Sequence, residues 1–416
     1  MPDLLYQFWD NFRHNLFKPL LLFFFMGFSV PILGVQFEFP YVIYQGLTIY
    51  LLIAIGWHGG EELAKLDPHV LGHALGFMAV GFLTNFIIGC IAYMLLRGTT
   101  KLRRIDAATI AGYYGSDSAG TFVTCVGVLT AASMPYAAYM PVMLAVMEIP
   151  GCLVALALVS RLRQTGMDPL GNMPDEVGYD PSALPPPTVA HGGHGQDKHA
   201  RDVELEKEMS LEKLEHNGNG DSNGAPALDA KPPGILSPEM LHEVFLNPGL
   251  FLLFGGIIIG FISQLQGPKV THDDDSLFLD LFQGILCLFL LEMGMTASRR
   301  LRDLKTAGWN FIAFGVIAPN VFATFGITVA HLFSTVTGHP LEIGTYVLFA
   351  VLCGAASYIA VPAVQRLAIP EASPTLPLAA SLGLTFSYNV TIGIPVYIMI
   401  ATALRDAFPV GVPGAG

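Results

Sequence analysis

Charged residues are scarce in this sequence. They make up 13% of its 416 residues, whereas an ordinary soluble domain is about 25% charged. Hydrophobic residues make up 52%, and they fall in runs of roughly 18 to 28 residues, long enough to cross a hydrocarbon layer of about 30 Å. There is also no basic stripe of the kind that binds nucleic acid. The sequence therefore predicts an all-helical, polytopic protein of the lipid bilayer, with no nucleic-acid partner.

Motifs for enzymatic chemistry are also missing. The sequence has no G-x-S-x-G, no Walker-type phosphate loop and no H-E-x-x-H, so neither those hydrolase classes nor ATP-driven work within this chain is indicated. The five cysteines are scattered through apolar segments, and their odd number argues against a disulfide framework. We expect no enzyme and no cofactor, and energy from a coupling ion such as sodium.

Apolar segments lie on both sides of one long polar stretch, five before it and five after it. Their approximate spans are 19–36, 40–56, 71–96, 107–133, 136–160, 247–264, 277–293, 308–334, 342–366 and 374–404. The polar stretch, residues 162–245, is rich in Pro, Gly, Asp, Glu and His, which predicts a largely disordered linker. The predicted domains are a first five-helix repeat over 1–161, the linker, and a second repeat over 246–416.

The positions of Lys and Arg predict the orientation of these segments. If the N-terminus lies outside, sixteen of the 21 Lys and Arg fall on the cytoplasmic side, as the positive-inside rule favours. Five crossings in each half then place the two halves in opposite orientations. We expect a multi-pass protein of the inner (plasma) membrane with both termini outside and the linker cytoplasmic.

Two of the apolar segments are interrupted by small and hydroxyl-bearing residues. The first interruption is Gly115–Thr121 (GSDSAGT) and the second is Gly354–Pro362 (GAASYIAVP). In each, a Gly is followed by a Ser three residues later, and an Ile-Pro pair follows further on. Interrupted helices at matching places in two halves point to the substrate site of a transporter. The sequence therefore predicts an inverted repeat, although the same small residues also pack helices together in membranes.

Anion binding in the middle of the membrane has to proceed without Lys or Arg, since none lies in the interior of a predicted span. The N–H groups at the start of a half helix, together with hydroxyl groups, attract anions. We expect the residues of the two interruptions that offer such groups to bind the substrate. They are Ser116, Ser118, Gly120, Thr121, Ser357 and Tyr358.

Carboxylates inside the hydrophobic layer are rare and usually mark an ion path or a proton relay. Asp117 and Glu148 are the clearest cases, and Asn389 and Thr391 precede a proline as Glu148 does. We expect these four residues to offer oxygen ligands to sodium. Other roles stay open, because Asp117 could cap a half helix, Glu148 could reach the lipid interface, and Asn389 could form an inter-helix hydrogen bond.

Three pieces of the sequence resemble the sodium-dependent bicarbonate transporters first associated with cyanobacterial carbon concentration. They are Gly112–Thr121 (GYYGSDSAGT), Met147–Pro150 (MEIP) and Tyr358–Pro395. The resemblance implies a ten-helix inverted repeat, a homotrimer, elevator-type motion, and inward symport of sodium and bicarbonate. It also implies a cytoplasmic PII-like regulator that senses adenine nucleotides.

These observations together predict a secondary active transporter that imports bicarbonate by sodium symport, with the anion bound between two half-helix N-termini. Three alternatives stay open. The chain could transport another small anion, it could be a cation/proton antiporter in which Asp117 or Glu148 carries protons, or it could be a membrane sensor that binds a ligand without flux.

Overall fold

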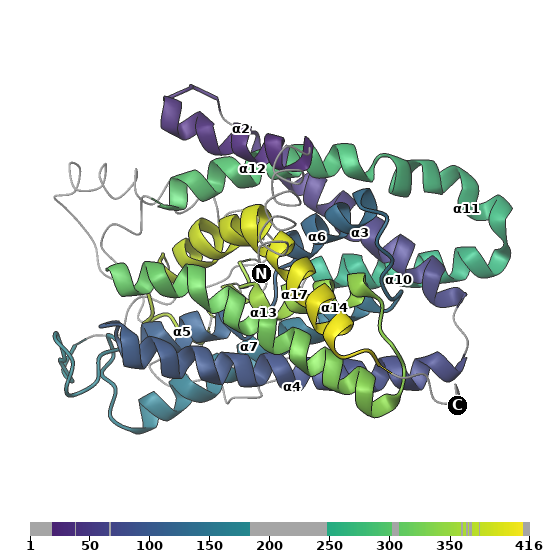
Figure 1. Ribbon diagram of the computed structural model, residues 1–416. Helices are drawn as coiled ribbons and strands as arrows, with labels where there is room; N and C mark the ends of the chain where they lie inside the picture. The colour runs from purple at the N-terminus through teal and green to yellow at the C-terminus, as the bar shows by residue number, and fades with distance from the viewer. Residues whose placement is uncertain are drawn as a thin grey trace, which may run out of the picture. The chain divides into compact units, whose positions relative to one another are not determined.

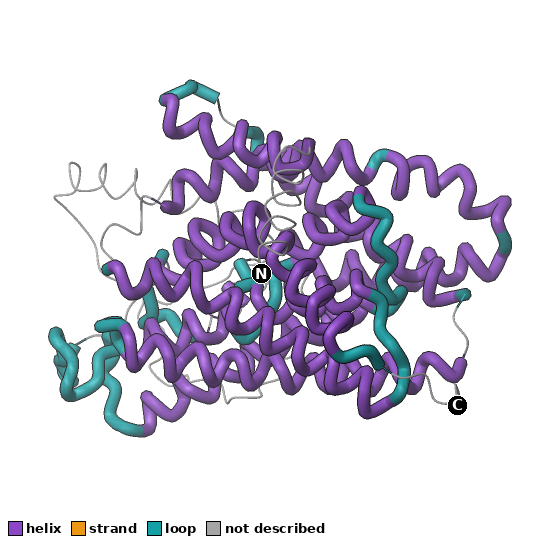
Figure 2. Tube along the Cα trace, in the orientation of Figure 1, coloured by secondary structure: helices purple, strands orange, loops and turns teal. Residues whose placement is uncertain are grey.

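The computed structural model describes residues 19–37, 39–65, 68–183, 248–301, 308–358, 361–362, 365, 368–373 and 375–410. These residues form helices joined by loops, and none of them is in a strand (Figures 1 and 2). The predicted all-helical class is confirmed. Most of the predicted linker, residues 184–245, lies outside the described residues, so its disorder stays a prediction.

Helices appear in every one of the predicted apolar segments. The first half contains α2 (Pro19–Leu33), α3 (Tyr41–Ala64), α4 (Pro68–Thr99), α5 (Arg104–Tyr114), α6 (Ala119–Ala131) and α7 (Met140–Gln164). The second half contains α10 (Pro248–Gln266), α11 (Pro268–Asp275), η1 (Ser276–Asp280), α12 (Phe282–Leu301), α13 (Trp309–Thr337), α14 (Ile343–Gly354), α16 (Leu376–Leu378), η3 (Ala379–Phe386), η4 (Asn389–Gly393) and α17 (Ile394–Ala407). The η elements are wide π-type turns, and the last four elements lie within one long apolar helix, Leu376–Ala407.

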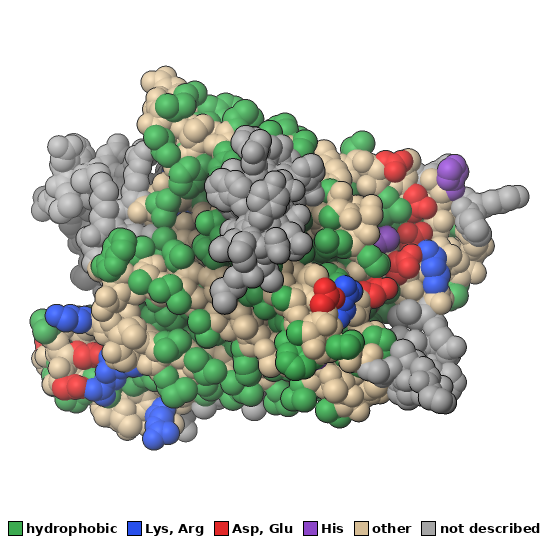
Figure 3. All heavy atoms as spheres, viewed as in Figure 1, with side chains coloured by type: hydrophobic (Ala, Val, Ile, Leu, Met, Phe, Trp, Pro, Cys, Tyr) green, Lys and Arg blue, Asp and Glu red, His purple; other side chains and the backbone are tan. Residues whose placement is uncertain are grey.

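Within the described residues, six helices are long and apolar enough to cross a membrane. They are Val42–Ala64, Gly72–Thr99, Met140–Gln164, Val270–Leu301, Trp309–Thr337 and Leu376–Ala407. On the face seen in Figure 3, charged side chains gather toward two opposite ends, beyond α5 on the left and near α11 on the right, and a mostly apolar region separates them. Charged side chains are costly inside the hydrocarbon layer of a bilayer, so they gather on its two sides. The chain is therefore a multi-pass membrane protein.

One group of helices is held together by close backbone contacts at glycines. In this group α2 packs along α12, and α3 packs along α10 (Figure 1). A Cβ atom added at Gly27 of α2 would lie 1.8 Å from the carbonyl oxygen of Leu291, and one added at Gly294 of α12 would lie 2.1 Å from that of Phe24. Only glycine permits such an approach, which is typical of helix packing in membranes. We call α2, α3, α10 and α12 the scaffold group.

A second group contains both interrupted segments. Here α4 and α5 pack on α7, and α13 and α14 pack on each other and on α17. One end of the group is fastened by ion pairs: Arg163 Nη2 lies 2.8 Å from Glu371 Oε2, and Arg103 Nε lies 2.8 Å from Asp106 Oδ2. Asp106 also accepts a hydrogen bond from the backbone N–H of Ser373 at 2.8 Å. We call α4, α5, α6, α7, α13, α14, α16, η3, η4 and α17 the core group.

Candidate functional site

The first interruption is a sharp break between two buried helices. Helix α5 ends at Tyr114 and α6 begins at Ala119, with Ser118 as its N-cap (φ −137°, ψ 111°). The Ser118 Oγ atom accepts hydrogen bonds from the backbone N–H of Thr121 (3.2 Å) and from the Thr121 hydroxyl (2.9 Å). The predicted interruption is therefore confirmed. Because the first N–H groups of a helix lack intrahelical partners, those of Ala119 and Gly120 are available to a ligand.

The second interruption repeats this arrangement and contacts the first. Helix α14 ends at Gly354, and Ala355 is extended (φ −88°, ψ 175°). The Ser357 hydroxyl oxygen accepts a hydrogen bond from the backbone N–H of Val361 at 3.4 Å, as the serine of the first interruption does with its own helix. The Ser357 backbone N–H donates to the carbonyl oxygen of Tyr113 at 2.9 Å. The two predicted stretches are thus joined directly, although 239 positions separate Ser118 and Ser357 in the sequence.

Tyr358 reaches from the second interruption to the first turn of α6. A Cβ atom added at Gly120 would lie 1.8 Å from Tyr358 Oη and 3.2 Å from Cζ of Phe289, so only glycine fits there. The Tyr358 hydroxyl is buried close to the Ser118 hydroxyl. No atom of the described residues meets it in proper hydrogen-bond geometry. A buried hydroxyl without a partner is costly, and here it lies at a helix N-terminus.

Asp117 lies inside the first interruption with its side chain fully buried. Neither of its carboxylate oxygens has a hydrogen-bond partner among the described residues. Asp117 therefore does not cap a half helix, since Ser118 does. Its carboxylate is within electrostatic range of Glu148 and of the Cys353 thiol. A buried carboxylate in this state requires either a cation or a proton.

Asn85 of α4 is a polar residue beside this site that sequence reasoning missed. Its side chain is fully buried, and its Nδ2 atom donates to the carbonyl oxygen of Met147 on α7 at 2.9 Å and to that of Leu352 on α14 at 3.5 Å. Its Oδ1 atom has no partner within the described chain. An Asn in the middle of the apolar run 71–96 was the available signal, because buried amides in membranes are rare and usually functional.

Ser116 and Glu148 connect the first interruption to α7. The Ser116 hydroxyl donates to the backbone carbonyl oxygen of Glu148 at 2.9 Å. Helix α7 passes close by, because a Cβ atom added at Gly151 would lie 2.1 Å from the carbonyl oxygen of Gly112. The Glu148 residue is only 9% exposed. It lies within the bundle and not on a lipid-facing surface.

Asn389 and Thr391 occupy different environments. The Asn389 amide donates to the carbonyl oxygen of Gly354 at 2.9 Å, and its Oδ1 accepts from the Tyr397 hydroxyl at 2.6 Å. It therefore forms the inter-helix hydrogen bond that we considered, at the end of α14. Thr391 is half-buried, and its hydroxyl donates to the carbonyl oxygen of Ser387 on its own helix at 2.7 Å. The structure brings Asn389 to the second interruption but does not connect Thr391 to it.

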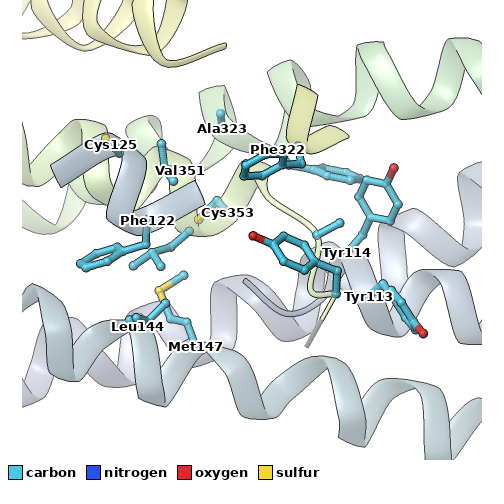
Figure 4. Packing of buried hydrophobic residues seen from close by; sticks show 14 of the residues in the cluster. Tyr113, Tyr114, Phe122, Cys125, Leu144, Met147, Phe322, Ala323, Val351 and Cys353 are labelled. Carbon is cyan, nitrogen blue, oxygen red and sulfur yellow. The ribbon is translucent and has the colours of Figure 1, made fainter. Parts of the chain in front are cut away.

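Apolar side chains enclose the two interruptions. Figure 4 shows side chains from α6, α7 and α14 gathered in one region, and all of them are buried: Phe122, Leu144, Met147, Val351 and Cys353. Such surroundings exclude water and strengthen the electrostatic interactions inside. Two helix breaks therefore meet in a buried, apolar region, together with a carboxylate and a hydroxyl that lack hydrogen-bond partners within the described part of the chain.

Comparison with known proteins agrees with this geometry. The sequence model of the Na⁺-dependent bicarbonate transporter superfamily matches residues 19–402, a range that includes both interruptions and all of both helix groups except the end of α17. No curated protein matches the chain by sequence. The matched family is one of transporters and not of enzymes. The chain therefore belongs to the Na⁺-dependent bicarbonate transporter superfamily.

Proposed function

We propose that this protein imports bicarbonate by symport with sodium. The observation that carries the proposal is Asp117, whose carboxylate is fully buried directly before the N-terminus of α6 and has no hydrogen-bond partner among the described residues. A cation at the carboxylate and an anion at the helix N-terminus would each compensate the other's charge. This mutual compensation gives a physical reason for coupled transport, because either ion alone would leave charge buried in a medium of low dielectric.

The anion would be held at the N-terminus of α6. The N–H groups of Ala119 and Gly120 point to it with the positive end of the helix dipole. The Ser118 hydroxyl accepts two hydrogen bonds from Thr121, so its own proton can be donated to the anion. The Tyr358 hydroxyl is a further donor. In this scheme Ser116 and Ser357 hold the backbone of the two interruptions in place.

The cation would be held by oxygen atoms around Asp117. Sodium is a hard cation and prefers carboxylate, amide and carbonyl oxygens. Asp117 offers two carboxylate oxygens and Asn85 offers Oδ1, all without partners among the described residues. Pro150 lacks an N–H group, so the carbonyl oxygen of Val146 loses its helical partner on α7. Glu148 would add negative charge to this region. Asn389 would act indirectly, by binding the carbonyl oxygen of Gly354 at the end of α14.

The inverted repeat has support from the helix contacts. If the first segment of each half is matched to the first segment of the other, and so on, the α2–α12 pair exchanges with the α10–α3 pair. In the same way the α5–α7 pair exchanges with the α14–α17 pair. The two serine caps, Ser118 and Ser357, exchange as well. We infer repeats within residues 1–161 and 246–416, joined by the linker 162–245.

Elevator-type motion follows from this arrangement as part of the proposal. Both interruptions belong to the core group, so this group would carry the ions while the scaffold group stays in place. We propose the orientation derived from Lys and Arg, with both termini outside and the linker in the cytoplasm. A homotrimer and a PII-like cytoplasmic regulator are expected from the family resemblance.

The proposed function is tested by uptake of labelled bicarbonate into proteoliposomes that contain the purified protein. Uptake should require an inward sodium gradient, and an equal potassium gradient should not replace it. Equal uptake with either cation would contradict sodium coupling. A pH-driven cation flux without bicarbonate would favour the antiporter, and ligand binding without any flux would favour the sensor.

Replacement of Ser118 by Ala should raise the apparent KM for bicarbonate about tenfold with little change in the sodium dependence. The variant loses a hydroxyl donor to the anion and a helix cap, and a cap alone is worth about 1 kcal/mol. Initial uptake rates at several bicarbonate concentrations measure the effect. Ser29→Ala is the control, because among the described residues the Ser29 hydroxyl donates to the carbonyl oxygen of Met26 on its own helix and not to the site. A normal KM for Ser118→Ala would assign this residue to packing.

A further inference from the structure

The N-terminus of α6 does not face the core group alone. Gly120 and Gly127 lie on one side of this helix, and both are crowded by side chains of α12 in the scaffold group. A Cβ atom added at Gly127 would lie 2.5 Å from Cδ2 of Leu286, and one added at Gly120 would lie 3.2 Å from Cζ of Phe289. The Gln283 amide also donates to the carbonyl oxygen of Gly127 at 3.0 Å. In this conformation, helix α12 therefore contacts the helix that begins at the proposed anion site.

An aromatic pair of the scaffold group covers this N-terminus. Phe289 of α12 and Tyr44 of α3 are stacked, with ring centroids 5.9 Å apart and an interplanar angle of 16°. Phe289 is buried, and Tyr44 is within electrostatic range of the Tyr358 hydroxyl. The pair therefore reaches the place where Gly120, Tyr358 and the start of α6 meet.

The two sides of this place have different chemistry. The core group contributes N–H and hydroxyl donors, which can bind any small anion. The scaffold group contributes the ring of Phe289, which has no polar atom and stacks on the ring of Tyr44. An apolar wall discriminates by size, and one methylene more or less in such a pocket changes selectivity by about 10- to 200-fold.

We propose that Phe289, supported by Tyr44, sets the size limit of the anion site and so excludes carboxylates larger than bicarbonate. This inference rests on the proposed function, since it assigns a selectivity residue to the same site. Donors of the core group bind the carboxylate end of an anion, and the phenyl ring occupies the space that a longer anion needs.

Sodium-driven uptake of labelled pyruvate, a larger carboxylate, tests the inference against labelled bicarbonate uptake in the same proteoliposomes. Phe289→Ala should raise the ratio of pyruvate to bicarbonate uptake at least about tenfold over the wild type. Leu286→Ala is the matched control, because Leu286 is a fully buried side chain on the same helix that packs on Gly127 and not on Gly120. Its ratio should equal that of the wild type.

The outcomes separate this inference from the function on which it rests. If the wild type takes up no bicarbonate with sodium, the proposed function fails first. If the wild type transports bicarbonate and folded Phe289→Ala keeps the wild-type ratio, the size limit does not reside at Phe289. If Phe289→Ala does not fold, Phe289→Leu takes its place with an increase in the same direction, and an unchanged ratio for that variant overturns the inference.

Discussion

Replacing Asp117 by Asn is expected to abolish sodium-driven bicarbonate uptake, by at least about 100-fold, and to leave the folded protein as stable as the wild type or more stable. The two effects have one cause. The carboxylate is fully buried, and neither oxygen has a partner among the described residues. An unpaired buried charge stabilises nothing in the absence of a cation. The amide keeps the shape of the side chain but removes the charge that attracts the ion.

Asp106→Asn is the control for this prediction, because Asp106 is a buried carboxylate of the opposite kind. It is paired with Arg103 at 2.8 Å and accepts a hydrogen bond from the backbone of Ser373. Its replacement leaves a partner unsatisfied, at a cost of about 1–3 kcal/mol. Thermal unfolding should therefore occur at a lower temperature in Asp106→Asn only, and its half-saturating sodium concentration should stay normal. Undiminished activation of Asp117→Asn by sodium would remove Asp117 from the cation site.

Much of the fold was accessible from the sequence because a bilayer imposes a simple rule on composition. Apolar runs of membrane-spanning length have to be helices, so each predicted segment contains a helix. The two interruptions could also be predicted, because a cluster of Gly and Ser in an apolar run favours a break in the helix. The recurring spacing of Gly115 to Ser118 and of Gly354 to Ser357 marked the places of the two breaks, although it did not predict that Ser118 caps α6.

The assignment of individual polar groups was less accessible, because their partners come from distant parts of the chain. The Ser116 hydroxyl is occupied by the carbonyl oxygen of Glu148, and the Asn389 amide by that of Gly354. The sequence alone predicted that Ser116 binds the anion and that Asn389 binds sodium. It could not show that both side chains already bond to these carbonyl oxygens. Asn85 was not predicted as a site residue. Its contacts with α7 and α14 show that it lies beside the two interruptions. Composition along a chain reports burial, but it does not report which atoms remain without partners.

The sequence also does not show which glycines of the scaffold group contact another helix. Gly260→Ala in α10 should destabilise the protein strongly, whereas Gly255→Ala in the same helix should not. A Cβ atom added at Gly260 would lie 2.3 Å from the carbonyl oxygen of Trp57 on α3, and one added at Gly255 meets no atom of the described residues within 4 Å. Both changes gain about 1 kcal/mol of helix propensity, so this term cancels between them.

The difference between the two variants isolates the contact between α3 and α10. Overpacking costs about 1–3 kcal/mol in Gly260→Ala only. At about 2 °C per kcal/mol for a long chain, this lowers its unfolding temperature by roughly 2–6 °C relative to that of Gly255→Ala. Thermal unfolding in detergent measures it, and equal temperatures would mean that the two backbones are not in contact. Because α10 belongs to the scaffold group, the Gly260→Ala protein that remains folded should keep the sodium and bicarbonate affinities of the wild type. If the ions bind in the core group, a contact within the scaffold group should affect stability and not affinity.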